Sequence, residues 1–72
     1  MMDFSGALGF LKRGARIRRQ LWPTGMYIVL GGQHSIDGER RIEQQLPEGR
    51  FFWSPRQADI LAGDWVEVPS RP

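Results

Sequence analysis

The segment that most constrains the fold lies near the C-terminus, where the sequence predicts a short helix between Trp53 and Trp65. Ser54 is a candidate N-cap, and Gln57 stands three residues later, where it can close a capping box. Gly63 is placed to end the helix in a left-handed conformation. Two aromatic rings thus flank one rigid element. Aromatic faces beside a helix N-terminus favour a site that stacks a flat ring and receives an anion.

The chain is too short to build a large core. It has 72 residues and no cysteine, so neither disulfides nor thiolate zinc sites can hold it together. Its one histidine, His34, gives little basis for a metal site, and we expect neither a metal nor a cofactor. Chains of this size are commonly stabilised by a partner subunit, so we expect a homo-oligomer. No apolar run approaches the roughly 20 residues of a membrane span and no signal peptide begins at Met1, so we expect a cytoplasmic protein.

An N-terminal helix is expected because apolar residues recur at the spacing of one helix face, at Phe4, Ala7, Leu8 and Leu11. Asp3 or Ser5 can cap its start, and Gly14 can end it.

Residue alternation and turn signals predict strands at residues 15–22, 26–30, 41–46, 50–53 and 65–68. The first two look like a hairpin joined by a turn at residues 23–25, and residues 33–39 read as a turn or loop tip. Short links between these elements predict one α+β domain over residues 1–72. It consists of a small antiparallel sheet with an N-terminal helix and a short capped C-terminal helix, and residues 1–3 and 69–72 are expected to fray.

The polar residues favour binding over catalysis. His34 lies in a glycine-flanked loop, where nothing is expected to orient it as a base. Asp59 and Asp64 are expected to point to different faces of the C-terminal helix and its exit, which argues against an acid/base pair. Gly31 and Gly32 lack the spacing of a phosphate-binding loop. We therefore expect a protein that is not an enzyme and has no catalytic residue.

Three blocks of residues carry a family resemblance. They are Phe4-Ser5-x-Ala7-Leu8-x-x-Leu11-Lys12-x-Gly14, Trp22-x-x-Gly25-Met26-Tyr27 and Trp53-x-Pro55-x-Gln57-x-Asp59-x-Leu61-Ala62-x-Asp64-Trp65. This layout resembles the Thoeris anti-defence 2 family of phage proteins. The resemblance implies a small homo-oligomer, typically a tetramer, that acts in the infected bacterial host. Such proteins bind cyclic nucleotide-type immune signals (cyclised ADP-ribose products and, in some members, cyclic dinucleotides) and sequester them without cleavage. The chain departs from the family pattern at Pro23, where members carry asparagine, and in its short middle at residues 31–49.

The candidate ligand-binding residues are Arg18, Arg19, Trp22, Gly25, Met26, Trp53, Ser54, Gln57 and Asp59. Trp22 and Trp53 are the candidates for stacking on a base, and the alternative for both is packing in the core or at an interface. Arg18 or Arg19 can pair with a phosphate, the alternative being a solvated strand face.

The remaining polar candidates have structural alternatives as well. Gln57 can donate to a base edge or serve only the capping box. Asp59 can accept from a ribose hydroxyl or base amine, or form a salt bridge. Trp65, in an alternating strand, is expected to be a core residue, and Met26 more often packs than touches a ligand.

Two further classes of function remain open. The basic stretch at residues 12–19 could serve a small single-stranded nucleic-acid-binding module, although a net charge of +2 is small for this. The aromatic residues and arginines could instead belong to a protein inhibitor of a host enzyme. A signal-binding protein fits best. Since one subunit can hardly enclose a ligand of roughly 35 non-hydrogen atoms, we expect a pocket between subunits.

Overall fold

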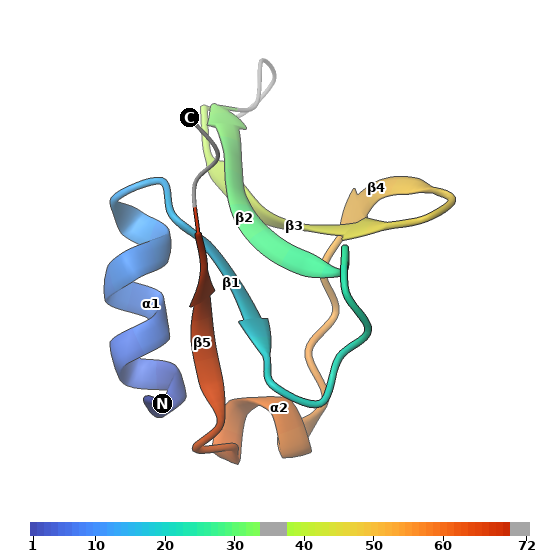
Figure 1. Cartoon of the computed structure of the whole chain (residues 1–72). Coiled ribbons are helices and arrows are strands. Elements are labelled where there is room, and N and C mark those ends of the chain that lie inside the picture. The colour runs from blue at the N-terminus through green and yellow to red at the C-terminus, as the bar shows by residue number, and fades with distance from the viewer. Residues whose placement is uncertain (34–37, 70–72) are drawn as a thin grey trace.

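The computed structural model describes residues 1–33 and 38–69, so His34 and most of the predicted loop around it lie outside the described residues. Within these residues the elements follow one another as α1 (Phe4–Lys12), β1 (Arg16–Arg19), β2 (Tyr27–Gln33), β3 (Arg40–Leu46), β4 (Gly49–Phe52), α2 (Gln57–Leu61) and β5 (Trp65–Val68) (Figure 1). The predicted α+β fold, with an antiparallel sheet, an N-terminal helix and a short C-terminal helix, is confirmed.

The strands form a five-stranded sheet in the order β4-β3-β2-β1-β5, and each neighbouring pair is antiparallel. The predicted hairpin of β1 and β2 pairs Ile17 with Ile28. β5 returns to the other side of β1, where Arg19 is opposite Trp65. This pairing brings α2, which precedes β5, to the end of β1 (Figure 1).

The N-terminal helix begins and ends where its local sequence directs. The Asp3 side chain accepts a hydrogen bond from the Gly6 amide at 3.0 Å, so Asp3 rather than Ser5 is the N-cap. Gly14 follows the helix with a φ of +89°, a left-handed conformation that glycine adopts readily. Residues 1–3 were expected to fray, but Met2 exchanges two backbone hydrogen bonds with Trp65, each 3.0 Å long.

The core lies between α1 and the sheet, and Trp65 is its largest residue. The fully buried hydrophobic side chains among the described residues are Ala7, Leu11, Ile17, Ile28 and Trp65. The ring of Trp65 contacts those of Phe4, Trp22 and Trp53 at centroid distances of 5.4, 5.3 and 5.9 Å. The expectation that Trp65 is a core residue is therefore confirmed.

The predicted start of the C-terminal helix is wrong by two residues. Arg56 is the N-cap, and Gln57 is the first helical residue rather than the third. Ser54 and Pro55 therefore precede the helix and its cap. The Asp59 carboxylate instead accepts a hydrogen bond from the Arg56 amide at 3.2 Å, which satisfies the backbone at the helix start.

The predicted left-handed stop at Gly63 is also wrong. The helix ends at Leu61, and the next residue, Ala62, is extended with φ −71° and ψ 149°; left-handed glycines occur elsewhere in the chain. The chain leaves α2 in an extended conformation because it enters β5 within three residues.

Candidate functional site

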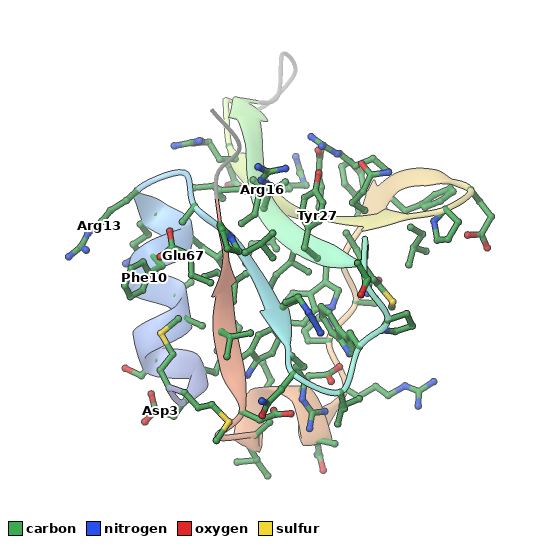
Figure 2. The ribbon with its side chains drawn as sticks, viewed as in Figure 1. Asp3, Phe10, Arg13, Arg16, Tyr27 and Glu67 are labelled. Carbon is green, nitrogen blue, oxygen red and sulfur yellow. The ribbon has the colours of Figure 1, made fainter. Side chains whose placement is uncertain are left out.

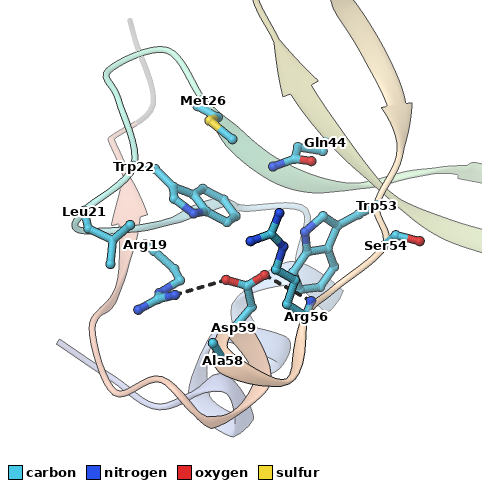
Figure 3. A pocket seen from close by; sticks show the side chains of 10 residues that line it. All are labelled: Arg19, Leu21, Trp22, Met26, Gln44, Trp53, Ser54, Arg56, Ala58 and Asp59. Atoms are coloured by element: carbon cyan, nitrogen blue, oxygen red, sulfur yellow. Dashed lines mark hydrogen bonds and ion pairs between the residues drawn. The ribbon is translucent and has the colours of Figure 1, made fainter.

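A hollow of about 400 Å³ lies where the end of β1, the connection to β2, strand β3 and residues 53–59 meet (Figure 3). We call it the indole pocket. It is lined by Arg19, Leu21, Trp22, Met26, Gln44, Trp53, Ser54, Arg56, Ala58 and Asp59. Most of the ligand-binding residues predicted from the sequence line this pocket, namely Arg19, Trp22, Met26, Trp53, Ser54 and Asp59.

Two tryptophans form walls of the indole pocket. The rings of Trp22 and Trp53 are half-buried, and each packs edge-on against Trp65, at interplanar angles of 81° and 87°. Their remaining surfaces border the hollow (Figure 3). Core packing and access to a ligand are therefore combined in the same two side chains. The core contact reduces the rotamer freedom that each ring would otherwise lose when a flat ligand stacks on it.

Arg19 is engaged with two carboxylates of its own chain. Its Nε donates to Asp64 Oδ1 at 2.8 Å, and its Nη1 donates to Asp59 Oδ1 at 3.0 Å. The hydrogen bonds to Asp64 and Asp59 raise the pKa of the Arg19 guanidinium. The hydrogen bond from Arg19 holds the pKa of the Asp64 carboxyl below its ordinary value. This cluster has one positive and two negative charges, so it offers no surplus positive charge to a phosphate.

The two carboxylates do not face apart, as the helical spacing had suggested. Helical spacing no longer applies beyond Ala62, and the turn before β5 brings Asp64 back to Arg19. For Asp59 the salt-bridge alternative describes its contacts, since one carboxylate oxygen binds Arg19 and the other accepts from the Arg56 amide.

Arg18 and Gly25 line a different hollow, on the face of the sheet where Arg16 lies over the ring of Tyr27 at 5.3 Å (Figure 2). The Nη2 atom of Arg18 donates to the carbonyl oxygens of Gln20 and Trp22, at 3.0 and 2.9 Å. Arg18 thus holds the turn that carries Trp22. Gly25 has a φ of +93°, which explains the need for glycine in this turn.

Gln57 lies outside the indole pocket as well. It is exposed and borders a shallow depression with Pro55, Ile60 and Leu61. This position does not support the predicted contact between Gln57 and the edge of a base in the indole pocket.

Sequence analysis missed Gln44 and Arg56. Gln44 is half-buried on β3 and reaches the indole pocket with its amide group (Figure 3). The sequence did contain a sign of this position. Gln44 is two residues from both Ile42 and Leu46, so it is a polar residue on the apolar face of the strand. Arg56 is exposed and also lines the pocket. It was overlooked because the helix start had been placed at Ser54.

The part of the chain that the structure describes contains neither a metal-binding cluster nor a membrane-spanning helix. There, no group of three or more His, Cys, Asp or Glu side chains is arranged to hold a metal ion. In the same residues, no helix has the length and apolar character needed to cross a membrane.

The comparison with known families agrees with the three blocks described above. A family model described as the Thoeris anti-defense 2-like domain matches residues 2–68. Among curated proteins, none matches the chain. The match covers the indole pocket, both helices and the whole sheet. The chain therefore belongs to the Thoeris anti-defense 2-like family, and its role is in Thoeris anti-defence.

Proposed function

We propose that this protein binds a cyclic nucleotide-type immune signal in the indole pocket and sequesters it without cleaving it. The observation that carries the proposal is that two indole rings, the amide of Gln44 and the guanidinium of Arg56 line one hollow (Figure 3). Stacking on an aromatic ring contributes roughly 1–3 kcal/mol per base. Trp22 and Trp53 supply the rings, and the Gln44 amide can both donate to and accept from a base edge.

The size of the pocket suits part of such a ligand. Its volume of about 400 Å³ falls within the range of small-molecule sites. A cyclised ADP-ribose product of roughly 35 non-hydrogen atoms could bind with tens of nanomolar affinity at about −0.3 kcal/mol per atom. Cyclic dinucleotides offer the same combination of bases and phosphates.

Retention without cleavage fits the residues that line the pocket. Hydrolysis requires a group that activates water or a nucleophile. The carboxylate that lines the indole pocket, Asp59, is held by Arg19 and by the Arg56 amide. Both oxygens of this carboxylate are engaged in contacts within the chain, so it is held by the fold rather than presented to a water molecule. We therefore propose that the protein is not an enzyme.

The indole pocket is open to solvent in a single chain, so we propose that the protein is a homo-oligomer, a tetramer, in which a second copy completes the enclosure. Phe52, Ile60 and Leu61 are large apolar side chains that are 63%, 42% and 82% exposed. Together with Pro55 they line two surface depressions next to the segment of residues 53–59. Residues of the same segment also line the indole pocket. A second copy seated on this apolar surface would lie next to the ligand and would enlarge a core that is small for an independent domain. We place this assembly in the cytoplasm of the infected bacterial host.

Calorimetric titration of the purified protein with cyclic ADP-ribose isomers and cyclic dinucleotides tests the proposed function. We expect tight, saturable binding of at least one of them. The bound molecule should be recovered intact by chromatography after the protein is heat-denatured. Conversion of more ligand than protein present would contradict sequestration. Binding of single-stranded DNA alone, with a steep salt dependence, would favour the nucleic-acid alternative.

A further inference from the structure

The indole pocket contains an arginine whose charge the fold does not use. Arg18 is bound to backbone carbonyl oxygens, and Arg19 is bound to two carboxylates. Arg56 is exposed and lines the pocket. Among the interactions of residues 1–33 and 38–69, its guanidinium makes no hydrogen bond or ion pair, and Figure 3 shows its side chain among those that line the indole pocket.

Arg56 also occupies a position in which arginine is unfavourable. It is the N-cap of α2, and its side chain makes no capping hydrogen bond. An arginine side chain has no acceptor atom with which to cap backbone amides, and its positive charge opposes the dipole at a helix start. Serine, threonine, aspartate or asparagine would be favoured at this position. Departures from local rules without compensation tend to mark functional residues.

We propose that Arg56 is the residue that pairs with the phosphate of the bound ligand and makes the indole pocket select anionic over neutral ring compounds. This inference rests on the proposed function, because it takes the pocket as the ligand site. The guanidinium can form two parallel hydrogen bonds to phosphate oxygens, a geometry that lysine cannot reproduce. It lines the same pocket as both stacking rings, so a base and its phosphate can be held together.

The Arg56→Ser variant tests the inference, because it should raise stability while it weakens binding. We expect a higher Tm, since serine can cap α2. The affinity for the tightest-binding cyclic nucleotide of the panel should fall roughly tenfold to a hundredfold, the range for losing a charged hydrogen-bond partner. Adenosine, which has no phosphate, should bind the variant and the parent equally. Arg56→Lys should fall between the two for the cyclic nucleotide.

Lys12→Ser is the matched control, since it removes the same charge from an exposed residue at the far end of α1. It should leave the affinity unchanged. If the parent protein binds the cyclic nucleotide and Arg56→Ser binds it equally well, the role of Arg56 is overturned while the proposed function stands. An equal loss of adenosine binding would also overturn it. If the parent binds no member of the panel, both the proposed function and this inference fail.

Discussion

The indole nitrogen of Trp65 donates a hydrogen bond to the main-chain carbonyl of Asp59 at 2.9 Å. Trp65 is fully buried at the centre of the core, whereas Asp59 lies on α2 beside the indole pocket. A core side chain thus holds the helix that forms one wall of the pocket. The side chain of Asp59 in turn binds Arg19 at the end of β1. Core, helix and strand are linked at this point, and the shape of the pocket follows from their packing.

The first prediction concerns the hydrogen bond of Trp65. Trp65→Phe keeps an aromatic ring in the core but leaves the Asp59 carbonyl without its donor. We expect a loss of about 1–3 kcal/mol in the free energy of unfolding, measured by urea denaturation. Ligand affinity should fall as well, because α2 is less firmly held. An unchanged unfolding midpoint would show that water replaces the indole nitrogen at no cost.

The second prediction concerns base stacking. Trp22→Ala should retain the oligomer but weaken nucleotide binding by about 1–3 kcal/mol, the contribution of one stacked base. Stability should decline too, because Trp22 packs edge-on against Trp65. Trp22→Phe serves as the control, since it preserves a ring and should recover most of the affinity. If Trp22→Ala dissociates the assembly yet binds the ligand normally, Trp22 is an interface residue and not a stacking residue.

The third prediction concerns acid stability. The hydrogen bond from Arg19 makes the pKa of Asp64 lower in the folded protein than in the unfolded chain. Such a carboxylate stabilises the fold above its unfolded pKa of about 3.9, and this stabilisation is lost as the pH falls through the lower folded value. Asp64→Asn should therefore be less stable than the parent at pH 7 and should lose less stability between pH 6 and pH 3.

Denaturant titrations at several pH values measure this difference. Glu48→Gln, which removes an exposed carboxylate in the turn between β3 and β4, is the control and should follow the parent. Parallel pH profiles for Asp64→Asn and the parent would mean that the pair with Arg19 contributes nothing to the acid response.

The fourth prediction concerns assembly. Leu61 is 82% exposed on α2, and Leu61→Glu places a charge in the apolar surface proposed to bind a second copy. Light scattering at micromolar concentration should give a mass well above 8.3 kDa for the parent and a lower mass for Leu61→Glu. Thr24→Glu, a charge introduced at an exposed turn residue, should retain the parent mass. A monomeric parent would remove both the shared pocket and the stabilising partner.

The fifth prediction follows from the corrected start of α2. Because Arg56 is the N-cap, Ser54→Ala should change the free energy of unfolding by less than about 0.5 kcal/mol, as expected for a surface substitution. Thermal unfolding followed by circular dichroism measures this. A loss of about 1 kcal/mol would restore Ser54 as the cap.

Local signals in the sequence determined most of the elements. The predicted bounds of β5 are those observed, because its alternation lies between clear turn signals. Asp3 and Gly14 bound α1 as expected, since capping depends on residues within one turn of each other. The start of α2 was misplaced because two overlapping capping patterns compete there, and only the reach of the Asp59 carboxylate back to the Arg56 amide decides between them.

The tertiary structure alone decided which residues share the site. Trp22 and Trp53 had been singled out from the sequence, but their common contact with Trp65 depends on β5 lying beside β1. The same strand pairing joins Arg19 to Asp64, 45 residues away, and leaves the guanidinium of the pocket residue Arg56 without a carboxylate partner among the described residues. Periodicity and capping act over a few residues, whereas sheet order is set by burying apolar side chains from the whole chain in one core. The sequence by itself therefore determined the elements and the kinds of side chain available for binding, and the packing of those elements determined which of them remain free to bind.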